Sequence, residues 1–300
     1  MTNIKNGFGS SETTREKQLE SCEKPIDFDF SAYLQEGTPQ HRPFIKTDFL
    51  EWFIGFVEAE GCFQTWKNTN GSYRFGFEIN QKDPGLMYKI RTRLGFGRVQ
   101  KYVRGNSVYF RFTTSKKEHL DRLILLFNGN LLLEKKQKQF NNWLFLMNLR
   151  YKTNILVKPN LCKVSLSTAW LSGFLEGDAG FYVQKLSEKT ERLNMKWYIT
   201  QEEELIVLND IRNLFQMPGT IYTLTNGHST KLYNRLETTS LEIHLFLLDY
   251  LQVYPFLGKR SIQLSRWRRL VNYRKTKYKL TPKLRKKFNR LIDGTKPDSL

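Results

Sequence analysis

The 300-residue sequence is poor in cysteine and histidine, and it contains no long apolar run. Its three cysteines, Cys22, Cys62 and Cys162, are odd in number and lack the spacing of metal ligands. This argues against a disulfide framework or a zinc site and favours a reducing compartment. No stretch approaches the ~18 apolar residues of a membrane span, and residues 1–30 resemble neither a signal peptide nor a transit peptide. We therefore expect a protein with no membrane partner.

Acidic residues are also scarce relative to basic ones. The chain has 48 Lys and Arg against 29 Asp and Glu, a formal charge of +19. Such an excess attracts polyanions, because neutralising phosphates releases their counterions. The charge therefore favours a nucleic acid as the partner over a merely solvated basic surface.

The chain contains an internal duplication. The segment Trp52–Phe63 (WFIGFVEAEGCF) matches Trp170–Phe181 (WLSGFLEGDAGF). Three further landmarks recur in the same order: Ile79–Gln81 with Ile199–Gln201, Thr113–His119 with Thr238–His244, and Leu133–Gln139 with Leu257–Gln263. Repeats in a conserved order indicate duplicated domains whose loops differ in length.

Within each copy, helical and strand-like patterns alternate. The first copy predicts a helix from 48 to 60 capped by Asp48, further helices over 84–94, 117–127 and 135–150, and strands over 73–79 and 108–113. Helices together with strands of one polar face predict an α+β fold. The predicted organisation is a poorly ordered extension at 1–44, a first domain at 45–150, a linker at 151–165, a second domain at 166–274 and a basic C-terminal tail at 275–300.

The duplicated helix presents a stripe of small residues. Gly55 and Ala59 lie four positions apart, as do Gly173 and Gly177, so each pair shares one helix face. Such stripes allow two helix backbones to approach closely. We therefore expect the two helices to pack along a pseudo-two-fold axis. The acids that end them, Glu60 and Asp178, would then converge.

Two acids at helix C-termini oppose the helix macrodipole, at about 0.3–1 kcal/mol each, and they repel one another. This arrangement indicates compensating cations, and oxygen ligands favour hard divalent metals. Metal ions in such a site activate water for phosphodiester cleavage. The earlier acids Glu58 and Glu176 point elsewhere on the helix, and we expect them to be structural.

Both segments resemble the LAGLIDADG motif, in the double-motif arrangement of single-chain, group I intron-encoded homing endonucleases. The resemblance covers about residues 47–270 and implies two αββαββα domains whose antiparallel sheets form a DNA-binding saddle. It also implies cleavage of both DNA strands, with Mg²⁺ (or Mn²⁺ or Ca²⁺) held by Glu60 and Asp178, in a monomer. The second motif departs from the pattern, because Ala179 occupies the position usually held by Gly.

The resemblance further implies basic and amide residues around the metals. Lys136 and Arg260 occupy matching positions in the two halves, with Lys135 and Lys259 as alternatives shifted by one residue. Gln81 and Gln201 end strands on the side of the apolar residues, which is unusual for an amide unless it faces a polar centre. We expect these side chains to complete the catalytic site.

DNA contacts are expected from the opposite side of each strand. A two-stranded ribbon fits the major groove, where a good bidentate contact is worth ~1–3 kcal/mol. The candidates are Gln64, Trp66, Arg74, Arg98, Gln100, Tyr109 and Arg111 in the first half, and Tyr182, Gln184, Tyr222, Tyr233 and Arg235 in the second.

The leading hypothesis is thus a metal-dependent endonuclease that makes a staggered cut in a long duplex DNA site. Two alternatives remain: a maturase that binds group I intron RNA, and a DNA-binding regulator without catalysis. Retention of an acid at both motif ends argues against the regulator. The Lys, Asn, Phe and Tyr usage suits AT-rich organellar coding, and a mitochondrion is favoured over a chloroplast.

Overall fold

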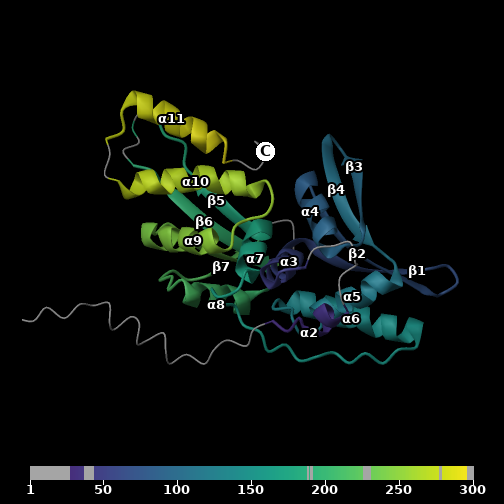
Figure 1. Ribbon diagram of the computed structural model, residues 1–300. Coiled ribbons are helices and arrows are strands. Elements are labelled where there is room, and N and C mark those ends of the chain that lie inside the picture. Colours follow the sequence, from purple (N-terminus) through teal and green to yellow (C-terminus); the bar gives the residue numbers. More distant parts are fainter. Residues whose placement is uncertain are drawn as a thin grey trace, which may run out of the picture.

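The computed structural model describes residues 28–36, 44–187, 189, 192–225, 231–276 and 279–295. They form two halves with the same order of elements, joined at the centre by one helix from each half (Figure 1). The first half consists of α3 (Thr47–Glu60), β1 (Gly61–Lys67), β2 (Tyr73–Gln81), α4 (Pro84–Leu94), β3 (Arg98–Arg104), β4 (Ser107–Thr114), α5 (Lys117–Phe127) and α6 (Glu134–Tyr151). The second consists of α7 (Trp170–Asp178), β5 (Ala179–Val183), β6 (Met195–Glu202), α8 (Leu205–Leu214), β7 (Tyr222–Thr225), β8 (Leu232–Thr238), α9 (Leu241–Val253) and α10 (Arg260–Lys275). The predicted pair of αββαββα domains is confirmed.

Each half contains a four-stranded antiparallel sheet. The strand orders are β1-β2-β4-β3 and β5-β6-β8-β7, which are equivalent. The register is equivalent too, because Gly61 pairs with Ile79 and Ala179 pairs with Ile199. The duplication seen in the sequence therefore extends to individual backbone pairs.

One face of each sheet is apolar and is covered by helices. On β2 the side chains of Phe75, Phe77 and Ile79 are at most 3% exposed, and Trp197 and Ile199 are fully buried on β6. In Figure 1, α9 and α10 lie across one face of β5 and β6. Burying a side chain of this size contributes about 1.5–3 kcal/mol. This alternation leaves the opposite face of each sheet polar.

The ends of the first helices differ in part from the prediction. Helix α3 begins at Thr47 with Lys46 as its N-cap residue, so the prediction that Asp48 caps it is wrong. Asp48 lies in the first turn instead, where its charge favours the helix dipole. Helix α4 spans the predicted residues, with Asp83 accepting from the Leu86 N–H and Gly95 at φ +80° ending it.

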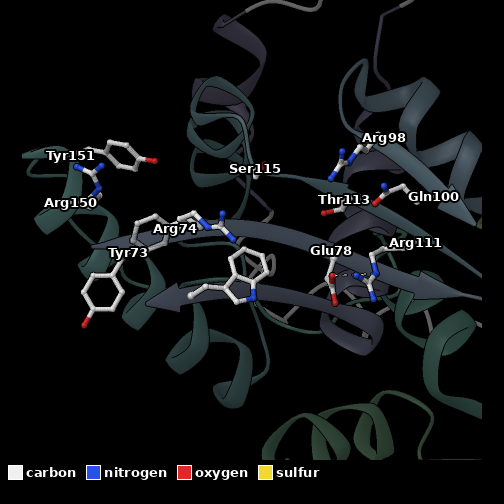
Figure 2. A pocket seen from close by; sticks show the side chains of 12 residues that line it. Tyr73, Arg74, Glu78, Arg98, Gln100, Arg111, Thr113, Ser115, Arg150 and Tyr151 are labelled. Carbon is white, nitrogen blue, oxygen red and sulfur yellow. Dashed lines mark ion pairs between the residues drawn. The ribbon is translucent and has the colours of Figure 1, made fainter. Parts of the chain in front are cut away.

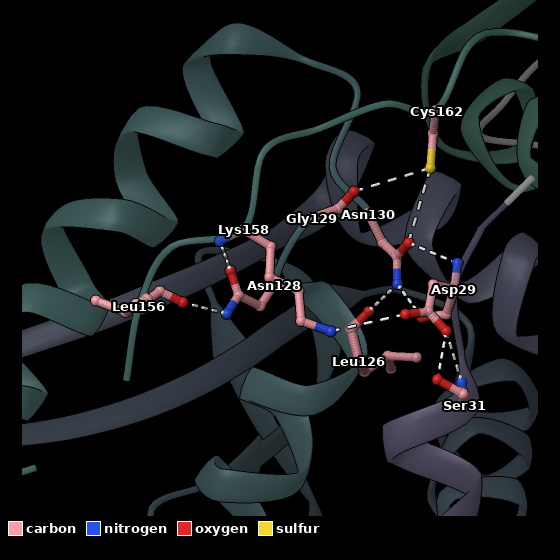
Figure 3. A network of polar contacts seen from close by, with 9 residues as sticks. All are labelled: Asp29, Ser31, Leu126, Asn128, Gly129, Asn130, Leu156, Lys158 and Cys162. Atoms are coloured by element: carbon pink, nitrogen blue, oxygen red, sulfur yellow. Dashed lines mark hydrogen bonds and ion pairs between the residues drawn. The ribbon is translucent and has the colours of Figure 1, made fainter. Parts of the chain in front are cut away.

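The N-terminal extension is partly folded. Helix α2 (Ser31–Gln35) follows Phe28 and Phe30, which are buried along with Tyr33. Figure 3 shows how Asn130 holds this segment: its side chain accepts from the Asp29 N–H (3.0 Å) and donates to the Asp29 carbonyl (2.8 Å). The expectation of poor order is therefore wrong for residues 28–36, while residues 1–27 and 37–43 lie outside the described residues.

The connection between the halves runs from 152 to 169 and contains no helix or strand. It is held in place by Asn128, whose amide donates to the Leu156 carbonyl (2.8 Å) and accepts from the Lys158 N–H (2.8 Å), as Figure 3 also shows. These bonds attach the linker to the first half.

The C-terminal segment folds onto the second half instead of forming a tail. Helix α11 (Pro282–Asp293) buries Phe288 and Ile292, and Phe288 packs against Tyr273 of α10. Asn289 exchanges two hydrogen bonds of 2.9 Å with the backbone of Leu186, beyond β5. The predicted boundary at 274 is therefore too early. In the described part of the chain, no helix is both long and apolar enough to span a membrane.

Candidate active site between the two halves

Helices α3 and α7 pack backbone to backbone at the centre of the molecule (Figure 1). A Cβ built on Gly55 would lie 2.0 Å from the carbonyl oxygen of Trp170. Gly173 makes the equivalent approach, with a Cβ 1.9 Å from the carbonyl oxygen of Trp52. Both distances are far below a van der Waals contact, so only glycine fits at either position. The stripe of small residues therefore forms the interface, and the interface is nearly two-fold symmetric.

Two buried glutamates, Glu58 and Glu176, form hydrogen bonds across the interface between α3 and α7, one on each side. Each is 2% exposed. Each accepts an indole N–H from the opposite motif helix, and two backbone N–H groups from the loop before α6 (for Glu58) or α10 (for Glu176). The donors are Trp170, Leu132 and Leu133 for Glu58 (2.5–2.7 Å), and Trp52, Leu257 and Gly258 for Glu176 (2.6–3.0 Å). Burial raises the pKa of Glu58 to about 8 and also raises the pKa of Glu176, while these donors act in the opposite direction. Their role is structural.

The acids at the ends of the two motif helices converge as the small-residue stripe predicts. A Cβ on Gly177, one residue before Asp178, would lie 3.3 Å from Cγ of Glu60. Burial and, to a smaller extent, the negative charge of Asp178 together raise the pKa of Glu60 to about 7. Burial raises the pKa of Asp178 to about 6. Two neighbouring, mostly buried acids with raised pKa values form a site that favours a bound cation.

An amide from each sheet contacts each acid. The side chain of Gln201 donates to Oδ2 of Asp178 at 2.6 Å, and Gln81 donates to the carboxylate of Glu60. Both hydrogen bonds lower the pKa of the acid that accepts them. The two glutamines therefore do face the polar centre, which explains their place among apolar strand residues.

Two cations hold the C-terminal carbonyl groups of the motif helices. The Lys136 ammonium donates to the Gly61 carbonyl at the end of α3. The Arg260 guanidinium donates to the carbonyls of Glu176 (2.6 Å) and Gly177 (2.8 Å), and also to that of Ala179. These contacts offset the negative end of each helix dipole. The positive charges of both cations also lower the pKa values of Glu60 and Asp178.

The alternative cations, one residue earlier, lie away from this centre. Lys135 forms an ion pair with Glu202. Lys259 is exposed, and its backbone N–H donates to Asp83 at 2.6 Å. Of the two pairs left open by the sequence, the structure brings Lys136 and Arg260 to the carboxylates.

The departure at Ala179 leaves the helix exit unchanged. Gly61 follows α3 at φ −81°, ψ 156°, and Ala179 follows α7 at φ −74°, ψ 143°. Both are extended conformations that any residue adopts. Asp178 is therefore presented in the same way as Glu60.

The oxygen-rich centre fits a hard divalent cation better than zinc. No group of three or more His, Cys, Asp and Glu suited to a metal occurs in the described parts of the chain. Glu60 and Asp178 are the two acids that meet at this centre, so they would be the carboxylate ligands of such a cation, with water and a bound phosphate as the other ligands. Mg²⁺ typically keeps several waters and takes one or two carboxylates plus substrate phosphate.

The predicted DNA-contact residues lie together on the polar faces of the two sheets. On the first sheet, Trp66 pairs with Arg74 and Gln100 pairs with Arg111 across the strands. On the second, Tyr222 pairs with Arg235. Gln64, Arg98 and Tyr109 share the first face by register, and Tyr182 and Tyr233 share the second. Gln184 lies just beyond β5, where its side chain accepts from the Asn194 amide at 2.9 Å. The strand register thus gathers most of these candidates on one face of each sheet, and their contact with DNA stays a prediction.

The face of the first sheet is hollowed by a cavity of ≈ 480 Å³. Figure 2 shows Arg74, Arg98 and Arg111 around it, with Arg150 of α6 at its edge. Glu78 pairs with Arg111 at 3.4 Å. The excess of arginine gives this concave surface the charge expected of a phosphate-binding groove.

Some residues on these faces were not foreseen from the sequence. Asn80 accepts from Nε of Arg111 (2.9 Å) and from the Tyr102 hydroxyl (3.1 Å), and the Arg111 guanidinium lies 4.8 Å above the Tyr102 ring. The second half repeats this arrangement with Arg235, Thr200 (2.9 Å) and Tyr198 (4.4 Å). The sequence offered one indication of this role, because Asn80 and Thr200 each directly precede one of the two predicted glutamines, Gln81 and Gln201. Such contacts fix each arginine before any ligand binds.

Comparison with known proteins gives a consistent picture. RNA maturase bI4 of Saccharomyces cerevisiae is 28% identical over 172 residues (56% of this chain, 25% of the relative), and probable intron-encoded endonuclease 4 of Neurospora crassa is 28% identical over 224 residues (73% and 39%). The chain thus spans less than half the length of either relative. Meganuclease I-SmaMI bound to uncleaveable DNA superposes with a TM-score of 0.66 at 18% identity, covering 83% of this chain and 99% of that one.

The model of the family described as LAGLIDADG endonuclease matches residues 53–146 and 171–271, once in each half. Each matched segment includes one motif helix, one sheet and the helix that brings Lys136 or Arg260 to the centre. The chain belongs to the LAGLIDADG endonuclease family.

Proposed function

We propose that the protein is a site-specific endonuclease that makes a staggered, Mg²⁺-dependent cut in both strands of a long duplex DNA site. The observation that supports this most directly is the convergence of Glu60 and Asp178 between two basic sheets, each acid with its own glutamine and cation. A binding protein without catalysis would gain nothing from two buried acids beside DNA phosphates. The same geometry supports a monomer, since one chain supplies both halves.

The residues divide the work of the reaction. The two sheet faces hold the duplex so that its two-fold axis coincides with that between α3 and α7, which places a phosphodiester of each strand near the carboxylates. Gln81 and Gln201 orient the carboxylates. Lys136 and Arg260 provide positive charge where negative charge develops on the phosphate. When bound, Mg²⁺ supplies a water of lowered pKa and neutralises charge on the phosphate oxygens.

The two halves have different side chains on equivalent strands, so the target is expected to be asymmetric or only pseudo-palindromic. A randomised duplex library incubated with the protein and Mg²⁺ would yield its cleaved sites directly. On the selected site, Glu60→Gln and Asp178→Asn should reduce cutting by about 10³-fold or more, while binding in Ca²⁺ remains largely intact. Unchanged cleavage by both variants, or no cleaved sequence from the library, would contradict the proposal.

A second candidate function is that of an RNA maturase. The yeast relative named as a maturase favours it, and so does helix α11, which exposes Lys283, Lys286, Lys287 and Arg290 outside the two sheets. A splicing assay with the host group I intron, run beside the cleavage assay, separates the two functions. We further propose that the chain is encoded and acts in an organelle, a mitochondrion rather than a chloroplast; mapping its coding sequence tests this.

A further inference from the structure

The helices that position Lys136 and Arg260 have no N-terminal cap of their own. The N-cap residue of α6 is Leu133 and that of α10 is Lys259, and neither side chain caps its helix. By contrast, α4, α9 and α11 are capped locally by Asp83, Ser240 and Thr281. Uncapped helix N-termini leave backbone N–H groups that need acceptors from elsewhere.

For α6 and α10 the acceptors come from the opposite half. Glu204, which is 4% exposed and precedes α8 in the second half, accepts from the backbone N–H groups of Glu134 (3.1 Å) and Lys135 (2.6 Å) in α6. Asp83, which precedes α4 in the first half, accepts at 2.6 Å from the backbone N–H of Lys259, the N-cap residue of α10. The exchange is reciprocal, and it follows the same pseudo-two-fold axis as the motif helices.

These caps lie next to the cations. Lys136 directly follows Lys135, and Arg260 directly follows Lys259, so each cation leaves the helix within one turn of the capped N–H groups. Removal of a cap typically costs a helix terminus about 0.5–2 kcal/mol. The loss would act on the first turn, where the cation is attached, and would leave the distant end of the helix packed.

The same short segments also hold the glutamines of the centre. Gln81 and Asp83 are separated by one residue, and Gln201 and Glu204 by two. A strand end in each half therefore places an amide on its own acid and a cap on the helix of the other half. Movement of one half relative to the other would displace a cation and an amide together.

We infer that Asp83 and Glu204 are positioning residues for the DNA cleavage reaction, which act by capping, across the interface, the helices that hold Arg260 and Lys136. This inference rests on the proposed endonuclease function. The pseudo-two-fold axis exchanges the two cations, and the two strands of a duplex are antiparallel. Each cation therefore serves chiefly one of the two scissile phosphates, and loss of each cap should slow one strand more than the other.

The test compares Asp83→Ala and Glu204→Ala with wild type on the library-selected site, with each DNA strand labelled separately, in single-turnover reactions at saturating enzyme. Misplacement of a catalytic group by about 1 Å can cost about 100-fold in rate. We expect each variant to slow the cleavage of one DNA strand by about 10- to 100-fold. The strand affected by Asp83→Ala should be the opposite of the one affected by Glu204→Ala, and nicked product should accumulate with both. Asp83→Asn and Glu204→Gln, which retain an acceptor oxygen, should recover most of the lost rate.

Ser240→Ala is the matched control, because it removes the local cap of α9 and leaves in place the acceptor at the N-terminus of α10. It should lower thermal stability while cutting both strands at equal rates. The inference is overturned if the alanine variants slow both strands equally, change only DNA affinity, or behave like Ser240→Ala. If an alanine variant fails to fold, the amide variants decide: a neutral amide oxygen is a weaker acceptor than a carboxylate, so a smaller bias against the same strand should remain, and equal rates on both strands overturn the inference. If the wild-type protein itself cuts no DNA, the proposed endonuclease function is wrong. This result differs from failure of the inference, in which the wild-type protein cuts DNA and the variants show no strand bias.

Discussion

Replacement of Gly55 by alanine tests the central interface most directly. In an exposed helix this change would stabilise the protein by about 1 kcal/mol, because alanine has the higher helix propensity. Here the new Cβ would lie 2.0 Å from the carbonyl oxygen of Trp170. The structure therefore predicts the opposite sign from the intrinsic propensity.

The size of the effect follows from the same distance. Real Cβ atoms essentially never approach a neighbour within 3.0 Å, so α7 must retreat from Gly55 by about 1 Å. Overpacking of a well-packed core costs about 1–3 kcal/mol, and here rigid backbone must move. The retreat also separates Glu60 from Asp178. We expect a net destabilisation of about 2–4 kcal/mol and a loss of about 100-fold in cleavage rate.

Denaturant unfolding and single-turnover cleavage measure the two effects. Gly219→Ala is the control, because Gly219 is exposed and a Cβ there meets nothing within 4 Å; it should change stability by less than about 0.5 kcal/mol. Gly173→Ala should match Gly55→Ala, and the double variant should be less destabilised than the sum, since both open one interface. A neutral or stabilising Gly55→Ala would refute the interlocked packing.

Four further predictions concern three features of the structure. Trp170→Phe removes a hydrogen-bond donor to the buried Glu58 and should lower the free energy of unfolding by about 1–3 kcal/mol in a denaturation experiment. Trp267→Phe is the control, because the buried indole N–H of Trp267 has no acceptor in the described chain. The pKa values of Glu60 and Asp178 are raised to about 7 and 6. Both acids therefore ionise at lower pH in the unfolded chain than in the folded one, so the melting temperature of the metal-free protein should fall as pH rises from about 4 to 7. Glu60→Gln should flatten this dependence of melting temperature on pH. Metal affinity by calorimetry should rise over pH 6–7 as the acids ionise; no rise would contradict the assignment. Arg111→Ala should relax discrimination at one base position by about 1–3 kcal/mol in a binding-site selection, and a uniform loss at all positions would instead indicate a phosphate contact.

The fold and several residues around Glu60 and Asp178 could be predicted from the sequence because the duplication repeats each feature in both halves. The position of Gln81 among apolar strand residues became informative once Gln201 repeated it. Alternation along the strands fixed the polar faces, since a side-chain period of two leaves only two choices. The matching positions of Lys136 and Arg260 were found in the same way.

Other features could not be predicted because they depend on long-range contacts. The capping of α10 by Asp83 joins residues 176 positions apart, and no local pattern marks it. Helix α2 is ordered by Asn130, about a hundred residues away, so its polar neighbourhood suggested disorder. Basic residues dominate α11 and concealed the buried Phe288 and Ile292 that hold it against α10.

The backbone contact between α3 and α7 has a consequence for how new target specificities can arise. Because the glycines at the crossing tolerate no side chain, the offset between the two cut positions of the proposed endonuclease would be set by the α3–α7 contact and not by the residues that recognise bases. Substitutions on either polar sheet can then change which sequence is recognised without altering the length of the overhang that is left. Each half can diverge, or be exchanged for the corresponding half of a relative, provided that its motif helix keeps this surface.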